Sequence, residues 1–328
     1  MSHPQWSRRS LLRAGAAGVF CLAGPVARAY PERAVRIVVP FAPGAGTDAM
    51  GRLMAQKLSE ALGGSFVVEN RTGASGAIGT QFVAQSPADG HTLLLVAAPF
   101  TTVPAVLANP GYDPVESFTP VSMLAQGPLV WACKKDLPVT NLSELAAYAR
   151  TRPGQLNFGS AGAGGINHLM LEHFKAHTDV SIVHIPYRGV APAVLDTVGG
   201  QIHLVNGTIP ALAPFIRDGR IRALAVSSPE RSPALPLVPG LAETGMTELT
   251  ALNYFGLVAP RGTPAAVIDR IDQALPGVLA AADVQSRFRS DALNPAPLGP
   301  RALAQFIAKD FESWRRVVVR QGIRLEQV

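Results

Sequence analysis

Short apolar segments alternate along this chain with segments in which apolar residues recur every three or four positions. The first apolar segment predicts a buried strand, and the next has the period of an amphipathic helix that ends at a glycine pair. This alternation is typical of parallel β-sheets covered by helices. The segments predicted as strands are 35–39, 66–69, 91–96, 129–134, 156–159, 182–185, 202–205, 221–226 and 254–259. The segments predicted as helices are 47–62, 76–85, 142–150, 166–177, 191–198, 210–217, 264–288 and 300–319.

A chain of 328 residues is long enough to favour two domains over one. No flexible linker interrupts the pattern, so we expect two α/β lobes joined by strands that cross between them, with 121–134 and 252–259 as the crossing segments. The first lobe is then discontinuous, with residues 30–128 plus 255–328, and the second lobe is 129–254. Ligands commonly bind in the cleft between two such lobes.

The N-terminus has the features of a secretory leader. The sequence SRRSLL at 7–12 precedes an apolar stretch at 14–24, and Ala27-Arg28-Ala29 is a small-x-small cleavage signal. The paired arginines favour the twin-arginine route, with the general secretory route as the alternative. The apolar stretch is too short to span a bilayer. We expect cleavage after Ala29 and delivery to the periplasm.

Removal of the leader changes the charge and the cysteine content. The full chain has 29 basic and 23 acidic residues, and the leader holds four arginines and no acid, which leaves 25 basic residues and a net charge of +2. That balance gives no reason to expect a nucleic-acid partner. Cys133 is the sole cysteine after the leader, so no intrachain disulfide is possible.

A glycine-rich corner follows the first predicted strand. Residues 44–49, GAGTDA, fit the G-x-G-x-x-A fingerprint of dinucleotide-binding proteins, and Glu69 ends the next strand. This pattern leaves open a dinucleotide-dependent oxidoreductase. Pro40 and Pro43 stiffen the approach to the turn, however, and Asp48 would repel a pyrophosphate in the first helical turn.

The same corner is also suited to a smaller anion. Thr47 or Asp48 can cap the helix, and free N–H groups at the helix start favour a carboxylate, which can sit on two or three amides without meeting Asp48. Two more glycine corners, 70–76 and 159–165, follow predicted strands. Together the three corners indicate a cleft lined by backbone amides.

The sequence gives little support for catalysis or for a metal. Ser160 does not lie in a G-x-S-x-G motif, and His168 on the following helix has no evident acid partner. His168 and His173 are five residues apart, which turns them to different sides of a helix. The histidines at 91, 184 and 203 are isolated at strand positions and are interpreted as structural. We therefore predict no catalytic residue, no cofactor and no metal.

Several short motifs follow one another through the chain after the leader. They are YP at 30–31, IVVPFAPG at 37–44, TD at 47–48, VVENRTG at 67–73, ADGHTLL at 88–94, YDP at 112–114, HIPYRG at 184–189 and RSPALP at 231–236. In this order they resemble the Bug family, the periplasmic solute receptors of tripartite tricarboxylate transporters. The resemblance covers essentially the whole mature chain.

The resemblance implies a type II periplasmic binding fold, in which two α/β lobes close over a small carboxylated solute. In the family the corner after the first strand supplies amides and ordered waters to a ligand carboxylate, and the corner after the third strand, here 97–102, faces the same cleft. The second lobe contributes three loops. The implied ligand-binding residues are Phe41, Ala42, Gly44, Ala45, Gly46, Thr47, Asp48, Ala98, Phe100, Thr101, Ser160, Ala161, Gly162, His168, Tyr187, Arg188, Gly207 and Thr208.

Three positions depart from the usual pattern of the family. Residues 96–100 read VAAPF where small polar residues are common, Gly207-Thr208 replace Asp-Asn, and Ala163 stands where a polar residue such as Asn is common. A receptor for an amino acid needs an acid to pair with the ammonium group. The lost acid and the added Phe100 favour a less polar ligand, such as an aromatic acid or a short-chain monocarboxylate.

The resemblance and the corners together predict a monomeric, non-enzymatic receptor that captures a small carboxylate by lobe closure. Its expected partners are the subunits of a membrane transporter. A ligand-sensing receptor for a signalling protein uses the same kind of site and stays open as an alternative, beside the dinucleotide-dependent oxidoreductase.

Overall fold

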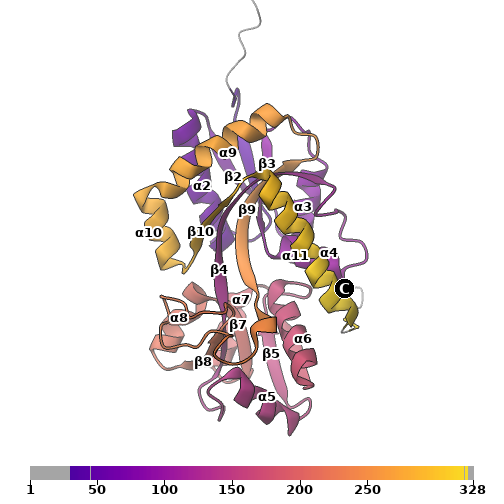
Figure 1. Cartoon of the computed structure of the whole chain (residues 1–328), viewed down its shortest axis with the longest axis vertical. Coiled ribbons are helices and arrows are strands. Elements are labelled where there is room, and N and C mark those ends of the chain that lie inside the picture. Colours follow the sequence, from indigo (N-terminus) through magenta and orange to yellow (C-terminus); the bar gives the residue numbers. More distant parts are fainter. Residues whose placement is uncertain (1–29, 45, 321, 324–328) are drawn as a thin grey trace, which may run out of the picture.

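The computed structural model describes residues 30–44, 46–320 and 322–323. The leader with its cleavage position after Ala29 lies outside the described residues, and so does Ala45 of the first corner. The described chain forms two α/β lobes stacked along the long axis of the molecule (Figure 1). None of the helices in these ranges combines the length and the apolar character needed to cross a bilayer.

The upper lobe in Figure 1, called lobe 1 below, is built on three parallel strands. β1 is buried along its length and lies between β2 and β3. The apolar side of α2, with Met50, Met54 and Leu58, packs against this sheet, so the predicted βαβαβ unit is confirmed. Its elements are β1 (Val35–Val39), α2 (Gly46–Leu62), β2 (Phe66–Asn70), the 3₁₀ turn η1 (Ala74–Gly76), α3 (Ala77–Ala84) and β3 (Thr92–Ala97).

The lower lobe, called lobe 2, repeats this design. β5 lies between β6 and β7 and is parallel to both, and helices follow each of the three strands (Figure 1). The predicted order of helices and strands is confirmed, although β7 begins two residues later than expected. The elements are α5 (Leu142–Arg150), β5 (Leu156–Ser160), α6 (Ile166–Thr178), β6 (Ile182–Pro186), α7 (Val190–Val198), β7 (Leu204–Thr208), α8 (Ile209–Arg217), β8 (Ile221–Val226) and the 3₁₀ turn η2 (Thr247–Leu249).

One long strand belongs to both lobes. The first part of β4 (Phe118–Lys134) pairs with β9 (Leu252–Pro260), and its last part pairs with β7 and β8. The main strand order is therefore continuous, β2-β1-β3-β9-β4-β7-β5-β6. At the junction the Ser227 hydroxyl accepts from the Leu129 amide and donates to the Ala251 carbonyl. The lobes are thus joined through the sheet itself, without a loose linker.

Three elements differ from the predictions. The helix predicted at 264–288 is two helices, α9 (Ala265–Ala280) and α10 (Ala282–Ser290), because Ala281 between them is extended. The corner expected at 97–102 is mostly helix, α4 (Pro99–Val106), and Pro99 is well placed at its start. β10 (Asn294–Leu298) pairs irregularly with β4. It was not predicted because its two prolines are rare in strands.

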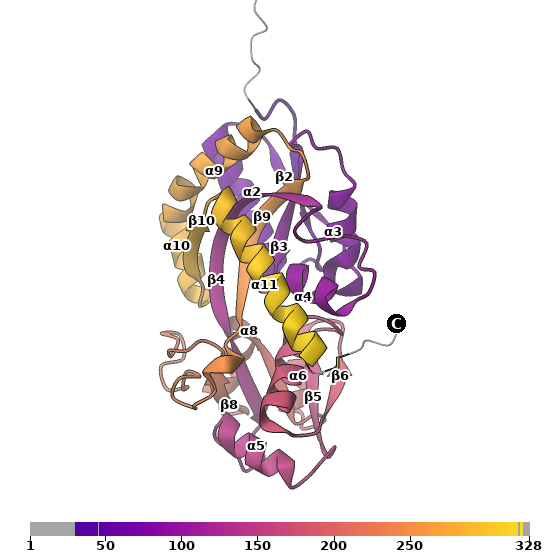
Figure 2. The same ribbon diagram turned by 45° about the vertical axis from the view of Figure 1, so that its right-hand side comes forward.

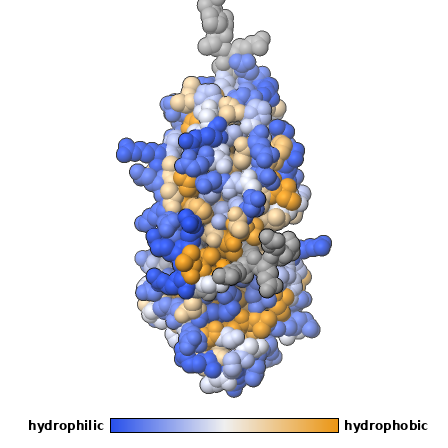
Figure 3. Space-filling model, turned by 90° about the vertical axis from the view of Figure 1, so that its right-hand side faces the viewer, coloured by the Kyte–Doolittle hydropathy of each residue, from blue (hydrophilic) through white to orange (hydrophobic). Residues whose placement is uncertain are grey.

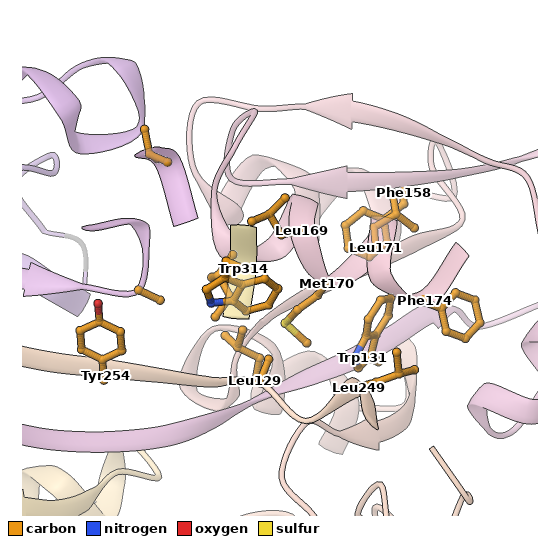
Figure 4. Packing of buried hydrophobic residues seen from close by; sticks show 14 of the residues in the cluster. Leu129, Trp131, Phe158, Leu169, Met170, Leu171, Phe174, Leu249, Tyr254 and Trp314 are labelled. Carbon is orange, nitrogen blue, oxygen red and sulfur yellow. The ribbon is translucent and has the colours of Figure 1, made fainter. Parts of the chain in front are cut away.

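The last helix, α11 (Pro300–Arg320), runs along lobe 1 and reaches lobe 2 (Figure 2). Its Trp314 lies beside Leu169 and Met170 of α6 (Figure 4), within a buried cluster that includes residues of both lobes. From the side where α11 and α6 meet, apolar surface gathers at the waist of the molecule (Figure 3). The lobes therefore share an apolar contact near the junction as well as the sheet.

Candidate ligand-binding cleft

The loops that follow the parallel strands of the two lobes face each other. Ser75, in the loop after β2, donates a hydrogen bond of 3.0 Å to the carbonyl of Ala163, in the loop after β5. Because the carboxyl ends of parallel strands share one edge of a sheet, this contact brings the two edges together. The corners singled out in the sequence at 41–48, 70–76 and 159–165 all lie at these edges.

Helices begin at the same two edges. At α3, α4, α6, α7 and α8 the residue that precedes the helix makes no side-chain cap to the first amides. At α5, which follows no cleft-edge strand, Asn141 accepts from the Glu144 amide at 2.8 Å. A side-chain cap is also missing at α9, so a missing cap alone does not indicate a binding site. Five uncapped starts around one cleft nevertheless make a setting that favours an anion.

Asp48 organises the first corner. The residue is 3% exposed, and its carboxylate accepts hydrogen bonds from the Gly44 amide at 2.9 Å, from Asn70 Nδ2 at 2.8 Å and from Arg52 Nε at 3.0 Å. Burial alone would raise the pKa of Asp48, but these three donors outweigh it and hold the pKa below its usual value. Asp48 therefore stays ionised and compensated.

This arrangement corrects one part of the sequence interpretation. The Gly44 amide, expected to be free for a ligand, is occupied by Asp48. Asn70 also donates to the Phe41 carbonyl at 3.0 Å, so it ties the end of β2 to the start of the corner. The corner is held in shape from both sides, and Gly46 and Thr47 at the start of α2 remain as its candidate amide donors.

A small enclosed cavity lies at the cleft edge of lobe 1. Phe41, Ser75 and Phe100 are among its lining residues, and the room open to a water-sized sphere is about 10 Å³. That is close to the space that one water molecule needs. The cavity is therefore too small for an organic ligand in this closed arrangement.

The residues on α4 lie deeper than the sequence suggested. Phe100 is 4% exposed and stacks on Tyr112 with 5.8 Å between ring centroids. The Thr101 hydroxyl is buried and donates to Asp310 Oδ2 at 2.6 Å, away toward α11. Ala98 is also buried, and its amide donates to Asn253. Both side chains take part in the packing of lobe 1, and Phe100 also lines the small cavity at the cleft edge. Their role in ligand binding stays a prediction.

Lobe 2 presents a pair of stacked histidines. The rings of His168 and His184 are 3.9 Å apart between centroids, and His184 Nε2 lies 2.6 Å from the Ser160 hydroxyl. Burial and the neighbouring His168 and Lys175 lower the pKa of His184 to about 3, and burial likewise lowers the pKa of His168. Both rings are neutral at pH 7. The expectation that His184 is isolated is wrong.

The Ser160 contact does not form a nucleophile. Ser160 is fully buried, and its hydroxyl donates to the Gly162 carbonyl at 3.0 Å and accepts from the Gly162 amide at 3.1 Å. His168 accepts from the Gly164 amide through Nδ1 at 3.2 Å. These bonds shape the loop that carries Ala161, which is exposed at the cleft edge.

The remaining predicted residues of lobe 2 differ in whether a side chain is free to contact a ligand. The Tyr187 hydroxyl donates to Asp196 at 2.7 Å, and burial together with this bond raises the pKa of Tyr187 to about 12. Arg188 is exposed, and within the described residues it has no ion pair. A Cβ atom on Gly207 would lie 2.7 Å from both Val190 and Leu212, so this position has no room for a side chain. Thr208 precedes the first turn of α8.

Three residues that belong to the cleft walls were not among the predicted site residues. Asn70 holds the first corner, Ser75 crosses between the lobes and His184 supports the loop after β5. Asn70 and Ser75 lay in a corner that the sequence analysis named without assigning roles. His184 begins the HIPYRG motif but was interpreted as an isolated structural residue, because its partners Ser160 and His168 come from other elements.

Two facing sets of strand ends, with helix starts on both sides, define a two-lobed α/β fold of the kind seen in periplasmic binding proteins. The sequence matches the model of the family described as "Tripartite tricarboxylate transporter family receptor" over residues 50–323. The chain belongs to this family.

Solved structures agree with this assignment. The chain resembles the periplasmic binding protein BugD, with 34% identity over 90% of this chain and 100% of that one and a TM-score of 0.81. A Rhodopseudomonas palustris protein, Rpa4515, solved with adipate, is 35% identical over 90% of this chain and 99% of its own, with a TM-score of 0.82. MatC from the same organism, with bound malate, is 30% identical over 88% of this chain and 100% of its own, with a TM-score of 0.80.

Proposed function

We propose that this protein is a periplasmic receptor that binds a small carboxylate between its lobes and delivers it to a membrane transporter of the tripartite tricarboxylate type. The observation that carries the proposal is the first corner, where Asp48 and Asn70 fix the start of α2 at the edge of lobe 1 whose neighbouring loop contacts lobe 2 through Ser75. The bound adipate and malate of the similar proteins support a carboxylate ligand.

The acids around the cleft favour a ligand that has no ammonium group. Asp48 is compensated by Arg52, Asp196 accepts from Tyr187, and Glu172 pairs with Lys175 at 2.8 Å. A buried ammonium would find no unpaired carboxylate among these side chains. The further preference for an aromatic or short-chain monocarboxylate rests on the replaced loop residues and on Phe100, which lines the small cavity at the cleft edge and stacks on Tyr112.

Thermal shift with a panel of acids tests the ligand class. We expect adipate, malate and simple aromatic or short-chain monocarboxylates to raise Tm in proportion to the logarithm of their concentration above Kd, and aspartate and glutamate to have no effect. Stronger stabilisation by aspartate, glutamate or citrate than by any aromatic acid would overturn the preference. Stabilisation by NAD with none by any carboxylate would favour the oxidoreductase alternative.

The proposal also includes export of the protein to the periplasm and a monomeric state. Tyr30, the first residue after the proposed cleavage position, is held to lobe 1, since its hydroxyl donates to the Gly90 carbonyl at 2.7 Å and its own carbonyl accepts from Arg270. A mature chain that starts at Tyr30 would therefore begin at an anchored residue. Genes for permease subunits beside this gene would favour transport, and a gene for a two-component sensor would favour the sensing alternative.

A further inference from the structure

Ser75 makes a direct contact across the cleft. Its hydroxyl donates to the Ala163 carbonyl at 3.0 Å, and a Cβ atom on the adjacent Gly162 would lie 3.0 Å from the same hydroxyl oxygen. The two lobes are therefore in van der Waals contact at this point. Ala163 belongs to the loop after β5, which also holds candidate ligand residues, so the contact joins lobe 1 to a wall of the proposed site.

The backbone around Ser75 is in an unfavourable conformation. Ala74 and Ser75 have φ values of 47° and 52°, in the left-handed region that residues with a Cβ seldom adopt. Gly73 and Gly76 on either side also have positive φ, at 127° and 98°. Strained residues of this kind persist where the surroundings hold them, and they gather at binding sites and switches.

The surroundings of this turn do hold it. The Gly76 amide donates to the Gly73 carbonyl at 2.9 Å, and the Thr80 hydroxyl donates to the Gly76 carbonyl at 2.9 Å. A Cβ atom on Gly76 would lie 3.2 Å from the ring of Phe41, so the turn rests on the first corner. The Ser75 hydroxyl is thus presented to lobe 2 from a fixed position and not from a free loop.

We propose that Ser75 is a latch, a positioning residue whose bond to the Ala163 carbonyl forms when the lobes close and slows the release of the bound solute. The proposal rests on the proposed function, because a latch has a role only where a ligand is enclosed. The strained backbone is its support, since it aims the hydroxyl across the cleft. Opening the lobes breaks one hydrogen bond at this point and exposes both of its partners to water.

Two substitutions distinguish the loss of the bond between the lobes from a loss of stability in lobe 1. Ser75→Ala removes the hydroxyl and keeps the Cβ, whereas Ser75→Gly removes the hydroxyl and also relieves the left-handed strain. We expect both variants to bind adipate or malate about two- to tenfold more weakly, the effect of one lost hydrogen bond, with most of the change in the dissociation rate. The Tm of Ser75→Gly should not fall, so its weaker binding cannot reflect misfolding.

The distance between the lobes gives a readout that needs no ligand. Spin labels on Ala61→Cys in α2 and Ala147→Cys in α5, both exposed alanines on opposite lobes, report closure by pulsed electron resonance. Cys133 is buried and burial raises the pKa of its thiol to about 11, so it does not compete for the label. We expect the Ser75 variants to populate longer distances than the parent. The matched control is Ser86→Ala, which removes a bond from Ser86 to the Phe82 carbonyl within lobe 1.

The outcomes distinguish the latch from the function on which it rests. Unchanged dissociation rates and distances in both Ser75 variants, in a protein that binds carboxylates, would overturn the latch and leave the receptor proposal standing. A parent protein that binds no carboxylate, yet opens when Ser75 is replaced, would overturn the ligand class and keep the latch. An equal effect of Ser86→Ala on the distances would also overturn the latch, because the change would not depend on the contact between lobes.

Discussion

The two walls of the cleft hold their shape by different means. In lobe 1 the first corner is built around an ionised acid, Asp48, which three donors compensate. In lobe 2 the loop after β5 is built around neutral groups, the stacked rings of His168 and His184 and the hydroxyl of Ser160. The difference predicts that the two walls respond to different substitutions and to different ranges of pH.

The contrast also bears on the ligand. A compensated acid in lobe 1 and neutral histidines in lobe 2 leave no uncompensated negative side chain among these cleft residues, so helix starts and the exposed Arg188 set the local potential. The charges of the two walls therefore do not discriminate between one carboxylate ligand and another. Selectivity must therefore depend on shape at the loops, and the predictions below test how rigidly each wall maintains its shape.

The largest effect is expected for Asp48→Ala. The substitution leaves the Gly44 amide, the Asn70 amide and the Arg52 guanidinium without their shared acceptor. Because hydrogen bonds to a charged group are among the stronger ones, we expect a loss of about 2–3 kcal/mol in the free energy of unfolding. Adipate binding should weaken by more than about tenfold, since the amides of the corner lose their arrangement. Urea unfolding and titration calorimetry measure the two effects.

Asp283→Ala serves as the control for Asp48→Ala. Asp283 pairs with Lys57 on the exposed side of lobe 1 at 2.7 Å, away from the cleft. The Asp283→Ala substitution should leave the affinity for a carboxylate unchanged. If Asp48→Ala bound its ligand as tightly as the parent protein, the role given to the first corner would be wrong, whatever the loss of stability.

The next effect is a dependence of stability on pH that belongs to lobe 2. The folded pKa of His184 is lowered to about 3 from 6.5, so between these values the unfolded chain binds a proton that the folded chain does not. Stability is then fully present above pH 6.5 and falls as the pH is lowered, by about 1.4 kcal/mol per pH unit for one such group. Asp48 has a depressed pKa, so its contribution is lost below about pH 4, the unfolded value.

Unfolding in urea at pH 7, 6 and 5 separates the two walls. The parent protein and Asp48→Asn should lose stability over this range with similar slopes, whereas His184→Gln should show a flatter dependence. The His184→Gln variant will be less stable at pH 7, because it loses the stack on His168. The test therefore compares the change of the unfolding free energy with pH and not its value at pH 7. Equal slopes in all three proteins would mean that His184 does not stay neutral in the folded state.

Much of the fold followed from periodicity, and the failures have physical reasons. Most strands of both lobes were predicted because they are apolar runs between turn residues, and the buried strand β1 is the clearest case. α4 was missed because a turn and a helix that starts with proline look alike in a short segment. β10 was missed because it has prolines and lies on an irregular edge.

The candidate site was predictable in place and less so in detail. Corners after parallel strands meet at one edge, so 41–48 and 159–165 could be located from topology alone. The direction of a side chain on a short helix could not be predicted, so the stack of Phe100 on Tyr112 was not expected. Contacts between lobes, such as Ser75 with Ala163, depend on tertiary geometry that no local pattern encodes.

The smallest effect is expected at Gly207, a residue of β7 that the sequence analysis assigned to the cleft. A Cβ atom there would lie 2.7 Å from Val190 of α7 and from Leu212 of α8, so Gly207→Ala should cost about 1–2 kcal/mol through overpacking. Gly277→Ala on α9 is the matched control. It meets nothing within 4 Å and should raise stability, since alanine favours a helix. Chemical denaturation compares the two variants.

A second substitution shows whether the crowding at Gly207 sets the shape of the lobe 2 wall. Val190→Ala removes one of the two side chains that a Cβ at position 207 would meet, so the double variant should recover part of the loss caused by Gly207→Ala alone, as coupled neighbours do. Additive losses would show that the contact with Val190 is not the cause. Recovery would mean that Val190 of α7 limits the size of the side chain that position 207 can hold.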